Sequence, residues 1–142
     1  MARQEDAEYW VPLEEMILEE GDSVRVAEGG FMDLQFGEMG PVVRFAEEAE
    51  CRLAELGFEE GEEERILHIV IDLAQGRVAA DLTGLAGGAT FFVRTGYWVV
   101  HGEGAVFEAR ADGSLVVEGG EVRVDVPEGE RFKVGPNECY SV

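Results

Sequence analysis

Histidine is the side chain that most often binds a metal or moves a proton in concert with others, and this chain has two of them. His68 and His101 stand far apart, and neither has a second histidine at metal-binding spacing. His68 lies in the alternating run ILHIVIDL, which predicts a strand-face position with a hydrogen-bond partner. His101 precedes a glycine, which predicts a partly exposed position at a strand end. Both histidines are therefore expected to be structural, and no metal site is expected.

Hydroxyl and carboxyl groups do not form a recognisable catalytic set either. No serine or threonine stands in a G-x-S-x-G elbow or beside a histidine, as nucleophilic hydrolysis would require. Glutamate is so abundant that a close carboxylate pair, as in a glycosidase, carries no information. The glycine doublets lack the lysine and the hydroxyl residue of a phosphate-binding loop. We therefore expect a protein that is not an enzyme, with no catalytic residue and no cofactor.

The two cysteines, Cys51 and Cys139, are widely separated and do not form a metal-spaced pair. Spacing alone does not show whether their Cα atoms come within the ~7 Å that a disulfide needs. We expect two half-buried free thiols, with a disulfide as the alternative.

The chain has 31 acidic and 11 basic residues, which give a formal net charge of −20. This charge disfavours nucleic acid and anionic lipid as partners, and it favours divalent cations or a basic protein at an acidic surface. The run FEEGEEER at 58–65 is expected to form a solvated loop, because it lacks the spacing of an EF-hand. No apolar run reaches the ~20 residues of a membrane span, so no direct membrane insertion is expected.

A length of 142 residues fits one domain with its own core. Short alternating runs recur about every ten residues and are separated by glycines, which is typical of an all-β sandwich or solenoid. The expected strands cover 23–28, 31–36, 41–46, 65–73, 77–82, 90–94, 97–101, 104–110, 114–118, 121–126 and 130–134. We expect a single twisted domain that is β-solenoid-like or β-sandwich-like.

The segment 45–56 favours a different structure. Its apolar residues at helical spacing are Phe45, Ala49, Leu53 and Leu56. Gly57 follows as a C-cap, so this spacing predicts a short helix. The run from Glu50 to Leu56 also permits an extended strand, because Cys51 and Leu53 fit a period of two.

The order of motifs from Trp10 to Gly135 resembles the FecR-like domain of bacterial envelope signalling proteins. WVPLEEMILEEGDSVRV resembles the family's N-terminal segment with its Gly-Asp turn, here Gly21 and Asp22. FMDLQFGEMGPVVRF resembles the next strand pair, and IDLAQGRVAADL resembles the middle strand with its turn at Gly76. FFVRT resembles the segment that leads to the family's most specific motif.

That motif, G-T-x-F-x-V followed by a glycine turn and an x-G-x-V strand, is similar to GAVFEARADGSLVVEGGEVRV. The matching residues are Gly104, Phe107, Gly119 or Gly120, and Val122. Ala105 stands where threonine is usual, Ala109 where valine is usual, and Glu103 where an arginine commonly precedes the motif. The glycines and the phenylalanine support the fold, whereas these departures weaken any contact that depends on the arginine.

The resemblance implies a twisted all-β domain at 10–135, between a tail at 1–9 and a tail at 136–142. Taken together with strand alternation, the resemblance implies six core residues, which are Phe36, Phe45, Leu73, Phe92, Val106 and Val116. It also implies a non-enzymatic, exported sensory or protein-interaction module, periplasmic or extracellular. In signalling members such a module relays the state of an outer-membrane transporter to a sigma-factor system. The anti-sigma segment and membrane span of that relay are not seen here, so the iron-uptake role is not carried over.

Three aromatic residues are candidate anchors for a protein partner, because aromatic residues are favoured at binding hot spots. They are Tyr97, Trp98 and Tyr140, and for each a core or rim position is the alternative.

A self-assembling surface or filament subunit is a second function, since open terminal strands can continue a sheet between subunits. A cupin-like or carbohydrate-active enzyme is less favoured. GEVRVDVPEGERF loosely resembles the second cupin motif, but the paired histidines of the first motif are missing.

Overall fold

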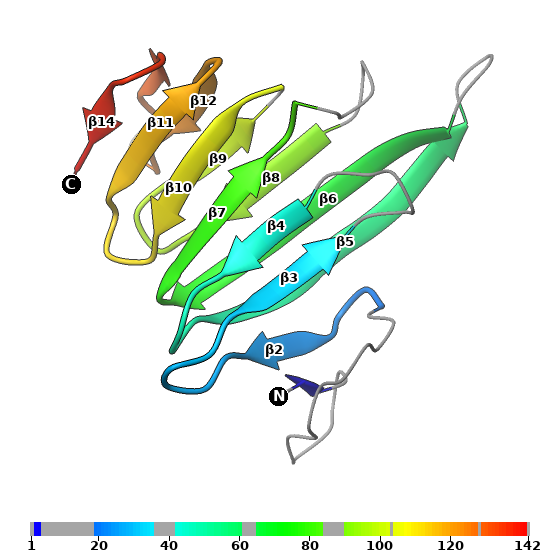
Figure 1. Ribbon diagram of the computed structural model, residues 1–142. Helices are drawn as coiled ribbons and strands as arrows, with labels where there is room; N and C mark the ends of the chain where they lie inside the picture. The colour runs from blue at the N-terminus through cyan, green and yellow to red at the C-terminus, as the bar shows by residue number, and fades with distance from the viewer. Residues whose placement is uncertain are drawn as a thin grey trace.

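The structure is a computed structural model, and it describes residues 2–3, 19–35, 42–60, 65–83, 90–102, 104–127 and 129–141. All secondary structure in these residues is β-strand, arranged as one domain of two sheets around a shared core (Figure 1). The two sheets do not close into a barrel. The all-β fold class expected from the sequence is therefore confirmed.

Each expected strand overlaps an observed one. The eight-stranded sheet has the order β1 (Ala2–Arg3), β2 (Ser23–Arg25), β5 (Glu50–Glu60), β6 (Arg65–Gln75), β8 (Thr90–Arg94), β9 (Val99–Gly102), β12 (Val122–Asp125) and β13 (Arg131–Val134). The six-stranded sheet has the order β14 (Cys139–Tyr140), β11 (Leu115–Gly119), β10 (Val106–Arg110), β7 (Arg77–Asp81), β4 (Val42–Phe45) and β3 (Met32–Gln35).

The chain advances along both sheets together. It builds one or two strands in one sheet and then crosses to the other, so each sheet follows the order of the chain from one end to the other (Figure 1). Neighbouring strands pair antiparallel except β6 and β8, which pair in parallel because β7, between them in the chain, belongs to the other sheet. The fold therefore combines the stepwise advance of a solenoid with the facing sheets of a sandwich.

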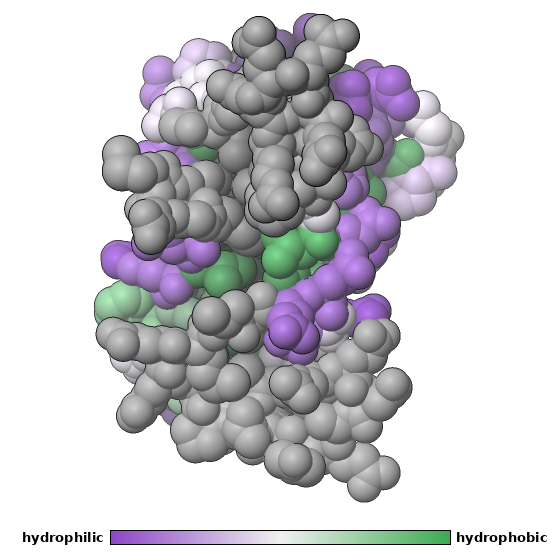
Figure 2. Space-filling model, turned by 90° about the vertical axis from the view of Figure 1, so that its right-hand side faces the viewer, coloured by the Kyte–Doolittle hydropathy of each residue, from purple (hydrophilic) through white to green (hydrophobic). Residues whose placement is uncertain are grey.

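Alternate residues of each strand build the core between the sheets. In β7, Val78 and Ala80 are buried, whereas the residues that flank them are exposed. Phe91 of β8 and Phe107 of β10 meet edge to face across the two sheets, with ring centroids 6.4 Å apart. Seen from the right-hand side of Figure 1, hydrophilic residues flank a group of apolar residues in the middle of the molecule (Figure 2).

The helix predicted at 45–56 is wrong, because Phe45 ends β4 and Glu50–Glu60 forms β5. The alternative of an extended strand from Glu50 to Leu56 is confirmed. The register between β5 and β6 shifts between Leu53 and Glu55, where β5 has an extra residue. Leu53 is buried before the shift, and Leu56 packs against the core after it. A strand with a bulge thus places apolar residues three positions apart, which imitates helical spacing.

The charged run at 58–65 was expected to be a loop throughout, and this was wrong for its two ends. Phe58 to Glu60 belong to β5, and Arg65 begins β6, where Glu60 and Arg65 are cross-strand partners. Residues 61–64 lie outside the described part of the chain. The two ends of the acidic run therefore extend the antiparallel pair of β5 and β6.

Two of the expected core residues, Phe45 and Leu73, are buried. Three other residues expected in the core instead face outward from their sheets: Phe92, Val106 and Val116. The residues that fill the core in their place are Phe91, Phe107 and Val117. Phe36 lies outside the described residues. Each error is one residue in size, which is enough to turn a side chain to the other face of its sheet.

Both segments expected to be tails contribute short strands. Ala2–Arg3 pairs with β2, and Cys139–Tyr140 pairs with β11. Tyr140 also packs against Phe132, with ring centroids 4.8 Å apart. The sheets therefore extend beyond the 10–135 range at both ends. The described residues contain no helix of the length and apolarity that crossing a membrane requires.

The two cysteines are free thiols with opposite environments. Cys51 is buried on β5, and burial raises the pKa of its thiol from 9.0 to about 12, whereas Cys139 is exposed on β14. Because the thiolate is the reactive form, we expect Ellman's reagent at about pH 8 to label Cys139 rapidly and Cys51 only after unfolding in urea. The Cys139→Ser variant should lose the fast reaction. Two equally fast thiols in the native chain would contradict the burial of Cys51.

Candidate functional site

Gly21 and Asp22, the Gly-Asp pair of the FecR-like resemblance, form the turn before β2. Gly21 has a φ of 93°, and its N–H donates to the carbonyl of Leu53 at 2.8 Å. The Asp22 carboxylate accepts a hydrogen bond from the N–H of Glu19 at 2.8 Å, and Asp22 is only 6% exposed. This turn therefore ties the start of β2 to β5 and leaves little of the aspartate for a ligand.

The other motif residues also shape the fold. The motif glycines with positive φ are Gly21, Gly76, Gly104 and Gly120. Gly119 ends β11, so the turn that follows depends on Gly120. Phe107 and Val122 are each 1% exposed in the core. These residues therefore have structural roles.

The three candidate aromatic anchors lie in different environments. Tyr97 is 47% exposed in the turn between β8 and β9. Trp98 is 1% exposed, and its indole N–H donates to the carbonyl of Gly113 at 2.9 Å. Trp98 is therefore a core residue, which corrects its assignment to a partner surface. Tyr140 is half-buried against Phe132.

Both histidines lie on the outer face of the eight-stranded sheet and contact Phe92. His68 bonds the Thr90 hydroxyl through Nδ1 and contacts the Glu55 carboxylate through Nε2 at 3.1 Å, which confirms the expected strand position with a hydrogen-bond partner. His101 is half-buried near the end of β9 and stacks on Phe92 with ring centroids 4.6 Å apart. Within the described residues, no group of three or more His, Cys, Asp or Glu side chains could hold a metal ion.

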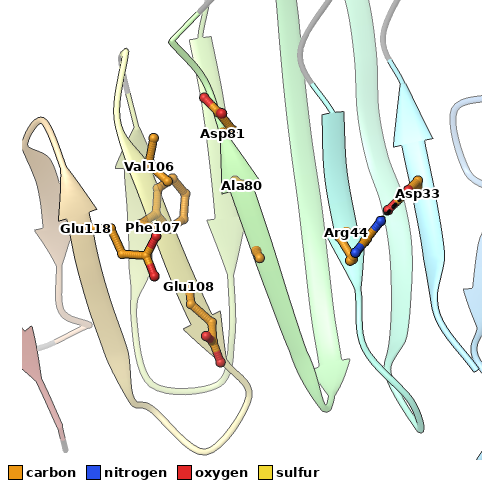
Figure 3. A pocket seen from close by; sticks show the side chains of 9 residues that line it. Asp33, Arg44, Ala80, Asp81, Val106, Phe107, Glu108 and Glu118 are labelled. Atoms are coloured by element: carbon orange, nitrogen blue, oxygen red, sulfur yellow. Dashed lines mark hydrogen bonds and ion pairs between the residues drawn. The ribbon is translucent and has the colours of Figure 1, made fainter. Parts of the chain in front are cut away.

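Two adjoining hollows, of ≈ 280 and ≈ 520 Å³, lie on the outer face of the six-stranded sheet. They share Arg44, Ala79 and Glu108, and together they form one open surface that we call the trough. The smaller hollow is shown in Figure 3, and its other outward residues are Asp33, Asp81, Val106 and Glu118. The larger hollow is also lined by Gly29, Gly30, Phe31, Ala46, Glu47 and Arg77.

Strand register explains why the surface is low here. Arg44 of β4, Ala79 of β7 and Glu108 of β10 are direct cross-strand neighbours. Ala79 points outward because Val78 and Ala80 on either side of it face the core. Its methyl group therefore lies between two long charged side chains, and the surface dips at β7.

An ion pair fixes one wall of the trough. The Arg44 guanidinium donates hydrogen bonds of 2.7 and 2.9 Å to the two carboxylate oxygens of Asp33 (Figure 3). These bonds lower the pKa of Asp33 and raise the pKa of Arg44. The same guanidinium lies 4.5 Å from the centroid of the Phe31 ring. Phe31 thus has a cation–π contact, although it is 64% exposed.

The facing wall is formed by Glu108, which serves two arginines. Its carboxylate accepts a hydrogen bond from Nε of Arg110 at 3.2 Å and lies 3.6 Å from Nη1 of Arg77. All three side chains are partly exposed, so these ion pairs contribute little to the free energy of unfolding. Their effect is local, because the two guanidinium groups offset the charge of the Glu108 carboxylate.

Two further carboxylates, Asp81 and Glu118, flank Val106 at the far end of the trough (Figure 3). Asp81 accepts hydrogen bonds from the hydroxyl and the N–H of Thr83, which lower the pKa of Asp81 and keep it ionised. Neither Asp81 nor Glu118 forms an ion pair with any described residue. This end of the trough therefore carries negative charge that no described cation balances.

Sequence reasoning did not find the trough. The one local signal lies in the run RVAAD at 77–81. Its outward residues are Arg77, Ala79 and Asp81, and the middle one is a small alanine between two charged residues. The neighbours that make it a hollow come from β4 and β10, which are distant in sequence.

No protein-family model matches the chain, and no curated protein matches its sequence. The fold is similar to crystal structures of a putative anti-sigma factor from Parabacteroides distasonis ATCC 8503, solved at 1.65 and 2.50 Å resolution. The TM-score is 0.64 for both, and the sequence identities are 24% and 23%. The match covers 82% of this chain and 52% of those chains, so this chain spans about half their length. At this identity the likeness establishes a shared fold.

Proposed function

We propose that this chain is a non-enzymatic sensory and protein-interaction domain of the bacterial cell envelope, of the FecR-like type. The observation that carries the proposal is the likeness of 82% of the chain to the fold of a putative anti-sigma factor. The order of the motifs around Gly21, Gly76 and Phe107 supports the same type of domain. Because the matched region is 52% of that protein, the proposal concerns one domain of a relay.

Such a domain acts by binding, and the fold suits this task. Paired strands fix the backbone of a sheet, so little backbone freedom is lost when a partner binds its outward side chains. A stable protein interface covers roughly 800 Å² on each partner. The accessible surface of this chain is 8641 Å², so an interface of that size would cover about a tenth of it. The family type implies a periplasmic or extracellular location.

In-cell photo-crosslinking tests the proposal. A benzophenone amino acid is placed at Val116, on the outer face of the six-stranded sheet, and separately at Tyr97; these residues are 40% and 47% exposed. We expect at least one position to yield a covalent adduct with a different envelope protein, and cell fractionation to place the chain outside the cytoplasm. A cytoplasmic chain that forms no adduct with another protein would refute the proposal.

A structural, self-assembling role is the second candidate. The observation that favours it is that β3 and β13 end their sheets and pair on one side only among the described residues. Sedimentation velocity in low salt and with millimolar calcium separates the two functions. Large calcium-dependent species, with adducts of the chain to itself, would favour assembly, because cations screen the charge of −20.

A further inference from the structure

The trough is long enough for a short extended segment of another protein. It runs from Phe31 beside β3 to Glu118 on β11, which is four strand spacings along the six-stranded sheet. Adjacent strands lie about 4.8 Å apart, so this length is roughly 19 Å. Phe31 also lies level with Arg77, four residues along the strand from Asp81, so the trough runs diagonally. An extended chain rises about 3.3 Å per residue, and about six or seven residues therefore span it.

Charge determines which kind of segment fits. The trough side chains already joined in ion pairs are Asp33, Arg44, Arg77 and Glu108, and Glu108 also pairs with Arg110 outside the trough. Asp81 and Glu118 carry charges that no described cation balances, and Val106 lies between them as the cross-strand neighbour of Asp81 and Gly119. A cationic side chain placed over Val106 would meet a carboxylate on each side.

The other end of the trough offers an apolar contact that is already fixed in position. Phe31 is 64% exposed and lies against the Arg44 guanidinium, which Asp33 holds with two hydrogen bonds. The loop before Phe31 is tied down as well, because the N–H of Gly29 donates to the Glu47 carboxylate at 2.6 Å. A fixed, exposed aromatic ring loses little entropy on binding, as hot-spot residues do.

We propose that the trough binds an extended segment of a partner protein, about six or seven residues long, in which a lysine or arginine pairs with Asp81 and Glu118 and an apolar side chain packs on Phe31. This inference rests on the proposed protein-binding function and adds the surface and the partner's chemistry. The net charge of −20 attracts any basic segment, whereas the trough adds two carboxylates and an exposed aromatic ring on one surface.

The test is a titration of the ¹⁵N-labelled full chain with the hexapeptide acetyl-FSASKS-amide, followed by NMR at about 20 mM salt. Its phenylalanine and lysine are four positions apart, so both side chains lie on the same face of an extended peptide. We expect amide shifts concentrated on β4, β7 and β10. The twin peptide with glutamate in place of lysine should cause no comparable shifts. If the shifts spread evenly over the acidic surface, or fall on the eight-stranded sheet, the inference is wrong.

Matched variants separate the trough from general attraction to an acidic protein. The double variant Asp81→Asn/Glu118→Gln should weaken binding of the lysine peptide by roughly fivefold. The double variant Glu121→Gln/Glu130→Gln removes the same charge beside β12 and β13 and should change the dissociation constant by less than about twofold. Equal losses in both double variants would reduce the effect to net charge and overturn the inference.

The aromatic end has its own matched pair. Phe31→Ala should weaken peptide binding by about threefold to tenfold, whereas Tyr97→Ala, which removes another exposed ring, should have no measurable effect. One contrary result is a partner, crosslinked in cells, that binds the wild-type chain, Asp81→Asn/Glu118→Gln and Phe31→Ala equally well. That result would overturn the inference about the trough and would leave the protein-binding function standing. If the peptide induced dimers in sedimentation and caused amide shifts on β13, the trough would be a contact with a second copy of this chain. That result would also overturn the inference.

Discussion

Replacement of Trp98 by alanine is expected to lower the free energy of unfolding by about 3–5 kcal/mol. The indole is 1% exposed, so its removal leaves a large cavity that the surrounding strands fill only in part. Its N–H also donates to the carbonyl of Gly113 at 2.9 Å. Trp98 precedes β9 of the eight-stranded sheet, and Gly113 lies in the turn between β10 and β11 of the other sheet, so this side chain joins the two. Urea unfolding followed by far-UV circular dichroism measures the loss.

Two variants divide the effect of Trp98 into its parts. Trp98→Phe keeps most of the ring but leaves the Gly113 carbonyl without its donor, which should cost about 1–2 kcal/mol. Tyr97→Ala removes the neighbouring exposed ring and should stay within about 0.5 kcal/mol of the parent chain. If Trp98→Ala were as mild as Tyr97→Ala, the indole would not be a core side chain, and its role as a surface anchor would be restored.

The positions of most strands could be predicted because their signals are local. A period of two and a glycine with positive φ are both properties of a few adjacent residues, as in GSLVVEGGEVRV, where Gly113 and Gly120 mark the turns. The phase of a strand could not be read where adjacent residues are both apolar. Phe91 and Phe92 are identical in type, and the choice between them is made by Phe107 on the facing sheet, which packs against Phe91.

The predicted helix failed for a physical reason that also lies outside the local sequence. The spacing from Leu53 to Leu56 fits a helix or a bulged strand, and pairing with β6 decides between them. The trough failed in the same way, because its floor at Ala79 becomes a hollow only when β4 and β10 place Arg44 and Glu108 on either side. Local pattern thus predicted the elements, and the surface they form depends on register between distant strands.

Replacement of Gly76 by alanine is expected to lower the free energy of unfolding by about 3 kcal/mol or more, because two penalties coincide. Gly76 has a φ of 83° in the turn between β6 and β7, where the chain crosses from one sheet to the other. An added Cβ would lie 2.6 Å from Cα of Ala49, and a backbone atom cannot move aside as a flexible side chain can. The Gly76 carbonyl also accepts the N–H of Ala111 at 2.9 Å, so a shift of this turn would disturb the β10–β11 hairpin.

Two other glycines isolate each penalty, so the three variants form one series measured by urea unfolding. Gly29 has a φ of 80° but nothing within 4 Å of an added Cβ, and Gly29→Ala should therefore show only the conformational cost, about 1–2 kcal/mol. Gly96 has neither a positive φ nor a close neighbour, and Gly96→Ala should be neutral or slightly stabilising. Equal losses for Gly76→Ala and Gly29→Ala would show that Ala49 does not approach Gly76 closely. The crossing between the sheets at this turn would then be looser than the structure has it.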